Sequence, residues 1–211
     1  MNLDLTALAA AATVGVACVA AVPASAQIIN PSFENETDGF TGWQIFGPGW
    51  RIGGPGDANT GDQAAVNDVL ASDTPDSFRG VQQTPTTGFS VGDTVVLSAF
   101  VAAASNEVTS SFLELQFLGA NSANLLTVTS EPVTEDQALT MESTPPTVVP
   151  AGTESLLIGG IVFYPPDAGT ITDTDFHIFD DFALNVTPVP EPASAAAGLL
   201  GLGLLATRRR R

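Results

Sequence analysis

The sequence predicts an all-β fold, a single β-sandwich, flanked by two terminal segments that serve sorting rather than folding. No stretch of residues 27–187 keeps a helical hydrophobic period. Short runs rich in β-branched and aromatic residues occur instead, and Gly, Pro, Asn and Asp separate them. Several such runs without intervening helices are typical of a sandwich, and no internal repeat or second domain is evident.

The expected strands follow one another along the chain. They cover residues 43–47, 94–104, 111–119, 124–130, 154–164 and 175–186. The third of them shows the clearest alternation, in which one face would carry Phe112, Glu114, Gln116 and Leu118 and the other Leu113, Leu115 and Phe117.

Residues 1–26 are predicted to be a signal peptide. An apolar run precedes Ala24-Ser25-Ala26, and signal peptidase is expected to cut between Ala26 and Gln27. The first four residues hold no Lys or Arg, so either the export signal is weakly charged or the true start lies upstream. The only cysteine, Cys18, lies in this segment, where lipidation is an alternative. The mature chain would hold no cysteine, which excludes disulfides and thiol chemistry.

The expected mature domain, residues 27–187, is strongly acidic. It keeps 21 of the 23 acidic residues against two arginines, Arg51 and Arg79, which gives a formal charge of −19, and the chain contains no lysine. Such a surface repels phosphate backbones, so nucleic acid is not an expected partner. The charge suits solubility outside the cell, or carboxylates that hold divalent cations.

The C-terminal segment, residues 188–211, combines three features in order. Val189-Pro190-Glu191-Pro192 is an extended acidic motif, because proline cannot join a following helix. Residues 193–206 are apolar or small and would form a helix of only ~21 Å, shorter than a bilayer core of ~30 Å. A cluster of basic residues that would stay cytoplasmic ends the chain, namely Arg208, Arg209, Arg210 and Arg211.

This tail resembles the PEP-CTERM sorting signal. The resemblance implies processing by a membrane-embedded exosortase near Pro190-Glu191-Pro192, transient membrane anchoring through the C-terminal helix, and a Gram-negative-type bacterium that makes exopolysaccharide or biofilm matrix. The expected location is therefore the cell surface or the extracellular matrix. An ordinary tail anchor is the alternative.

A second resemblance covers most of residues 29–186. The opening "INPSFENETDGFTGWQIFG", the turn and strand "FSVGDTVVLSAFVAA", and the closing strand "HIFDDFALNV" resemble carbohydrate-binding-module and galactose-binding-like domains, and so imply a jelly roll. Strict alternation in the closing strand would place Asp180 inward beside Phe182, where a carboxylate needs donors or a cation.

In the resembled domains a structural calcium lies where the first and last strands meet. The resemblance implies Glu34 and Asp180 as its ligands, with Asp181 as the alternate, and oxygen donors suit calcium. The alternative is that Asp180 accepts hydrogen bonds from backbone amides. Residues 57–62, "DANTGD", lack the side chains of a calcium loop and are expected to form a solvated turn.

Sugar binding needs exposed aromatic rings together with polar groups. The candidates are Trp50, placed in a loop with Arg51 beside it, and Tyr164, with Phe46 as a further ring. The resemblance assigns Trp43 to the core, because the matching position in the resembled domains packs inside. No enzyme is expected, because the one histidine, His177, would point outward and no nucleophile motif is evident.

These observations predict an exported, exosortase-processed surface or matrix protein whose sandwich binds polysaccharide. The alternative is a non-catalytic, calcium-stabilised structural or adhesion protein of the biofilm matrix.

Overall fold

The computed structural model describes residues 27–35, 39–70, 73, 77–85, 88–104, 109–134, 136–166 and 175–189. These residues form eleven strands and one short 3-10 helix. In chain order, the elements are β1 Gln44–Phe46, β2 Trp50–Gly53, β3 Ala64–Val69, β4 Ser77–Gln83, β5 Thr94–Ala104, β6 Ser110–Leu118, η1 Ala120–Ser122, β7 Asn124–Thr129, β8 Gln137–Ser143, β9 Thr147–Val148, β10 Ser155–Tyr164 and β11 Asp175–Thr187.

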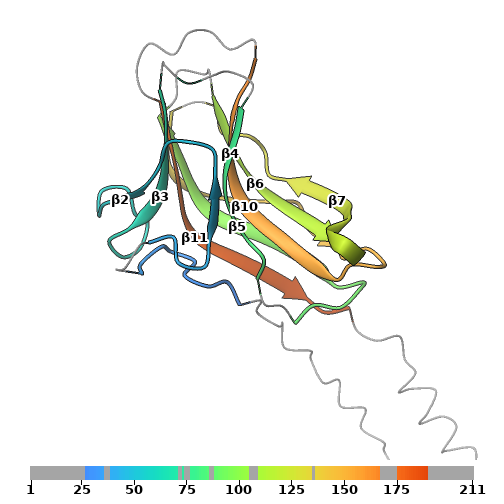
Figure 1. The fold of residues 1–211 in the computed structure, drawn as a ribbon. Coiled ribbons are helices and arrows are strands. Elements are labelled where there is room, and N and C mark those ends of the chain that lie inside the picture. The colour runs from blue at the N-terminus through green and yellow to red at the C-terminus, as the bar shows by residue number, and fades with distance from the viewer. Residues whose placement is uncertain are drawn as a thin grey trace, which may run out of the picture.

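The strands form two antiparallel sheets that pack face to face, which confirms the predicted all-β sandwich of jelly-roll type (Figure 1). The five-stranded sheet has the order β1-β4-β10-β6-β7. The six-stranded sheet has the order β2-β3-β11-β5-β8, with β9 also paired to β5. Strands from distant parts of the sequence are therefore neighbours, as β3 and β11 are in the six-stranded sheet.

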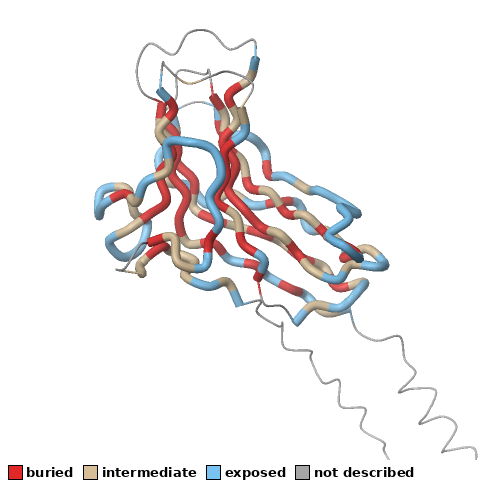
Figure 2. Tube along the Cα trace, in the orientation of Figure 1, coloured by how far each residue is buried: buried red, intermediate tan, exposed pale blue. Residues whose placement is uncertain are grey.

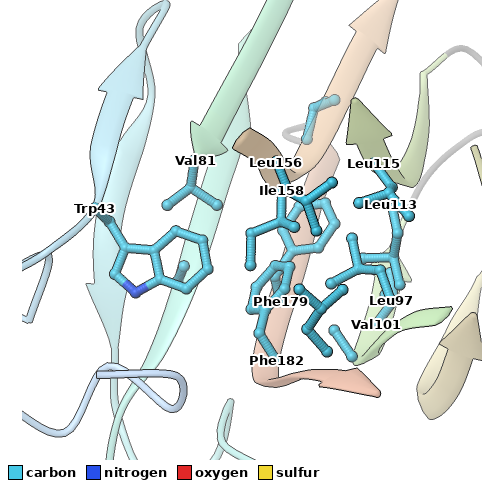
Figure 3. Packing of buried hydrophobic residues seen from close by; sticks show 14 of the residues in the cluster. Trp43, Val81, Leu97, Val101, Leu113, Leu115, Leu156, Ile158, Phe179 and Phe182 are labelled. Atoms are coloured by element: carbon cyan, nitrogen blue, oxygen red, sulfur yellow. The ribbon is translucent and has the colours of Figure 1, made fainter. Parts of the chain in front are cut away.

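The core lies between the sheets. Val81, Leu113, Leu115, Leu156 and Ile158 of one sheet meet Leu97, Val101, Phe179 and Phe182 of the other (Figure 3). Figure 2 shows the buried stretches running along the strands, whereas all three residues of β1 are exposed.

Trp43 closes one side of this core, as the sequence predicted. Its ring centroid lies 4.7 Å from that of Phe182 and 5.2 Å from that of Phe33. Its indole N–H donates to the carbonyl oxygen of Asn30 at 2.8 Å. The segment after Gln27 is thereby attached to the last strand of the domain.

Candidate functional site

A loop of residues 54–63, here called the covering loop, is held by two adjacent carboxylates of β11. Asp180 Oδ2 accepts hydrogen bonds from the backbone N–H groups of Asn59 at 2.7 Å and Thr60 at 3.2 Å. Asp181 accepts from the Asn59 side-chain amide at 2.8 Å and from the Thr60 hydroxyl at 2.7 Å. The loop is therefore fixed to the last strand through both backbone and side-chain donors.

Glu34 holds the far end of the same loop. Its Oε1 accepts from the backbone N–H groups of Asp62 at 2.9 Å and Gln63 at 2.7 Å. Gly61 has a φ of +70°, and a Cβ at this position would run into the Glu34 carboxylate. Glycine is therefore required here both by the backbone conformation and by the close approach of Glu34.

The Asp180 side chain is enclosed beneath this loop and has no solvent exposure. Burial raises its pKa to about 6, and the neighbouring Asp181 adds to the rise. The amide donors of Asn59 and Thr60 oppose the rise, because they favour the charged form. The structure thus realises the hydrogen-bonded arrangement that the sequence left open for Asp180.

The strand alternation predicted for β11 is wrong in its first half, because the strand contains a β-bulge. The pairing with β5 shifts register between Asp180 and Ala183, and Asp181 has a φ of +50°. Phe182 and the later residues face the core as predicted, but before the bulge Phe179 faces it instead. Asp180 therefore lies on the outer side of its sheet, under the covering loop, and not between the sheets.

The same shift places His177 inside the sandwich, which corrects its predicted outward position. His177 Nε2 lies 2.8 Å from Thr109 Oγ1, and Nδ1 lies 3.0 Å from Ser111 Oγ. Because the Thr109 hydroxyl donates its proton to Asp175 at 2.9 Å, it accepts from Nε2–H, so Nδ1 accepts from Ser111. Burial, assisted by the positive charge of Arg79, lowers the pKa of His177 to about 3. All four linked residues are buried, so this chain of hydrogen bonds is a structural feature of the interior.

The side-chain oxygen atoms around the covering loop are of the chemical type that binds calcium. Glu34 and Asp180 offer carboxylate oxygens, and the buried Gln63 Oε1 has no hydrogen-bond partner. However, no three acidic, His or Cys side chains within the described ranges are grouped closely enough to hold a metal ion. Glu34 and Asp180 are the residues that would hold calcium, with Asp181 as the alternate, and calcium binding stays a prediction.

The predicted sugar-binding residues do not form a common surface. Tyr164 is only 3% exposed and packs in the core, so its ring is not available to a ligand on the surface, and this prediction is corrected. Trp50 begins β2 rather than lying in a loop, packs partly buried near Phe179, and donates to the carbonyl oxygen of Phe46 at 3.1 Å. Arg51 is exposed, but its guanidinium is bound to Asp68 at 2.7 Å, and that bond raises its pKa.

The outer face of the five-stranded sheet, here called the five-stranded face, carries an apolar row across four strands. Strand pairing places Phe46, Gly80, Ile161 and Phe112 side by side. Phe46 is 37% exposed, and its ring lies over Gly80, where a Cβ would run into it. The row therefore presents the Phe46 ring over Gly80 and the Phe112 ring three strands from Phe46, while Ile161 between them is almost fully buried.

A polar row lies next to the apolar row on the same face. Strand pairing aligns Gln44, Gln82, Gly159, Glu114 and Thr129 across all five strands. Gln116 Nε2 donates to Glu114 Oε1 at 2.7 Å, which orients the carboxylate. Beyond the apolar row, the rings of Phe78 and Phe163 stack with centroids 4.4 Å apart, and Phe78 is 55% exposed.

These two rows offer what a sugar polymer requires: apolar surface under ring faces and hydrogen-bonding groups beside them. Neighbouring strands lie ~4.8 Å apart, close to the length of one pyranose unit, so a sugar chain lying along the rows would place about one unit over each strand.

Phe46 was named as a candidate from sequence, whereas the rest of this face was not recognised. The alternation in 111–119 placed Phe112, Glu114 and Gln116 together, and that was the available signal. What was missing was the order of the strands, which brings Phe46 and Gln82 from distant segments to the same face.

The sorting predictions lie outside the described residues, except at their borders. Ala24 and Ala26 precede the first described residue, Gln27, while Pro190 and everything after it follow the last, Val189. In the ranges that the structure describes, no helix has both the length and the apolar character needed to cross a membrane.

No protein-family profile and no curated protein matches the sequence. Solved structures do share the fold. The CBM22-1 xylan-binding domain from Paenibacillus barcinonensis Xyn10C superposes with a TM-score of 0.54 at 18% identity, covering 81% of this chain and 100% of that domain. The Stig cyclase Fisc from Fischerella sp. TAU gives 0.55 at 13%, with coverage of 80% and 100%.

The enzymatically active domain of the bacteriophage CBA120 tailspike protein 4 gives a TM-score of 0.55 at 14% identity over 76% of this chain. The match covers only 21% of the tailspike chain. At these identities the likeness concerns the fold alone, and the fold is found in sugar-binding domains and in enzyme-related proteins.

Proposed function

We propose that this chain is an exported cell-surface or matrix protein whose sandwich binds polysaccharide through the five-stranded face, without cleaving it. The observation that carries the proposal is the alignment of the apolar row beside the polar row on the outer side of one sheet. The fold that the chain shares with a xylan-binding domain supports it.

Replacing Phe46 with Ala tests this proposal. Loss of the exposed ring over Gly80 should weaken binding of the full chain to neutral soluble glycans about tenfold. Affinity electrophoresis against xylan, galactomannan and hydroxyethylcellulose measures the change. Met141→Ala is the matched control, because Met141 is an exposed apolar side chain, 64% accessible, on the other sheet. Equal affinities for wild type and Phe46→Ala would refute the assignment of the face.

We further propose that the C-terminal segment is the sorting signal that brings the domain to the surface. The support is the order of its three parts in the sequence: Pro190-Glu191-Pro192, the apolar run and the four arginines. Replacing the three motif residues with alanine should leave the protein in the inner membrane, as judged by cell fractionation. Unchanged arrival at the surface would refute the sorting role.

A structural role is the second candidate, and the covering loop favours it. Two segments from opposite ends of the domain, at Glu34 and at Asp180-Asp181, hold one loop through carboxylates of the kind that bind calcium. A domain that only stabilises or fills the matrix would respond to calcium and show no affinity for glycans.

A further inference from the structure

Among the described residues, none on the five-stranded face is positively charged. The chain has no lysine, and Arg51 and Arg79 are its only arginines before the C-terminal cluster. Arg51 belongs to β2 in the other sheet and is bound to Asp68. Arg79 belongs to β4, but its side chain is buried between the sheets and forms an ion pair with Asp73 at 2.9 Å. No cation from these described positions is therefore available to an anionic ligand on this face.

Negative charge is present on the same face, on the strand next to edge strand β7. Glu114 lies in the polar row, where strand pairing places it between Gly159 of β10 and Thr129 of β7. The inward-facing residues on either side of it, Leu113 and Leu115, are fully buried, so its carboxylate is on the outer side. The hydrogen bond from Gln116 fixes its position without neutralising its charge.

The domain as a whole adds to this local charge. The chain carries a formal charge of −17 even with its arginine cluster, and a field of this sign lowers the concentration of anionic polymers near the surface. Hydroxyl groups of a neutral sugar suffer no such repulsion, and they can donate hydrogen bonds to the Glu114 carboxylate.

Resting on the proposed function, we infer that the five-stranded face takes uncharged glycan chains and excludes glycans that carry carboxylate or sulfate groups. Glu114 is the residue on the face that sets this choice. Glu114 acts as an acceptor for sugar hydroxyls and as a repulsive charge towards acidic sugars, and the neighbouring glutamines serve both kinds of chain alike.

Matched derivatives of one backbone test the inference. Hydroxyethylcellulose and carboxymethylcellulose share a β-glucan chain and differ in charge. Methyl-esterified and free polygalacturonate share a galacturonan chain and likewise differ in charge. The full chain, purified in a nonionic detergent, should bind the neutral member of a pair at least about tenfold more tightly at about 10 mM salt. The ratio should shrink at about 1 M salt, where charges are screened within ~3 Å.

Glu114→Gln should lower the neutral-to-anionic affinity ratio about threefold, the effect of removing one charge a few ångströms from the ligand in water. Glu142→Gln is the matched control. Glu142 lies on β8 of the other sheet and likewise accepts a hydrogen bond from a glutamine, Gln137, at 3.1 Å. It should leave the ratio unchanged, and the arginine cluster is the same in both variants.

The outcomes separate the two claims. Anionic members that bind as tightly as neutral ones would overturn the charge inference while leaving glycan binding in place. An equal fall of the ratio in Glu142→Gln would overturn the role of Glu114. Absence of binding to every member, or neutral binding that survives Phe46→Ala, would overturn the proposed function and the inference that rests on it.

Discussion

Strands β6 and β11 both carry polar residues in an apolar pattern, but they place them in opposite settings. On β6, Glu114 and Gln116 alternate regularly with core leucines and remain partly exposed. On β11, His177 and Asp180 are fully buried, one between the sheets and the other beneath the covering loop. Polar residues therefore face the solvent on one strand and form enclosed hydrogen bonds on the other.

The difference shows what decides the role of a polar side chain in this fold. The outer side of β11 is covered by residues 54–63, so its carboxylate is enclosed and compensated by amide donors. The outer side of β6 has no loop over it among the described residues, so the sheet face itself is the surface. Changes on β11 should affect stability, and changes on β6 and its neighbours should affect binding.

The largest expected effect comes from the interior of β11. As pH falls, the unfolded chain protonates its histidine near 6.5, whereas folded His177 has a pKa of about 3. The unfolded state therefore gains the proton first, and stability present above pH 6.5 is lost as pH falls towards 3, by about 3 kcal/mol at pH 4.

His177→Gln removes this titration while keeping groups that can bond Thr109 and Ser111. Urea unfolding at pH 7 and pH 4 should show wild type losing about 3 kcal/mol more than the variant on acidification. The carboxylates titrate in both proteins and cancel in the difference. Parallel losses in the two proteins would mean that His177 is not held neutral by burial.

The next effect concerns the covering loop and calcium. If Glu34 and Asp180 hold calcium, the ion stabilises the folded chain by about 2.7 kcal/mol at a concentration 100 times its dissociation constant. Thermal melting of the full chain in calcium and in chelator measures this. Asp180→Asn should abolish the difference, whereas Glu142→Gln on β8 should preserve it. Identical wild-type curves would remove the metal site and leave the amide donors as the only compensation.

The sequence was sufficient to predict the fold class because most of the long strands have a recognisable pattern of apolar and β-branched residues. Residues 94–104 were predicted with the observed bounds of β5, and β6 and β10 were placed within one residue. β8 was missed because "QALTMES" is rich in helix-favouring residues, and only its pairing with β5 makes it a strand. β3 and β4 were missed because alanine, glycine and arginine weaken their pattern.

The candidate site was less predictable, for a physical reason. Alternation assumes an unbroken period of two, and one left-handed residue, Asp181, reverses it for the first half of β11. The exposure of Trp50 and Tyr164 depends on packing partners such as Phe179 that no local pattern reveals. The five-stranded face depends on strand order, which joins residues more than 60 positions apart, as with Phe46 and Phe112.

The smallest expected effect tests whether the face is a built surface rather than a chance grouping. In Gly80→Ala the new Cβ would run into the Phe46 ring and lie 2.9 Å from Ile161 Cδ1. The backbone of Gly80 does not require glycine, since its φ is not positive, and the half-exposed ring on edge strand β1 can rotate into solvent. Affinity for hydroxyethylcellulose should therefore fall about threefold, equivalent to ~0.7 kcal/mol, with little change in the melting temperature.

Gly54→Ala is the matched control, because nothing lies within 4 Å of its new Cβ and it belongs to the covering loop of the other sheet. If Gly80→Ala binds as tightly as wild type, the position of the Phe46 ring over the sheet does not contribute to recognition. The difference between the exposed outer side of β6 and the enclosed outer side of β11 would then be a difference in burial, without a consequence for binding.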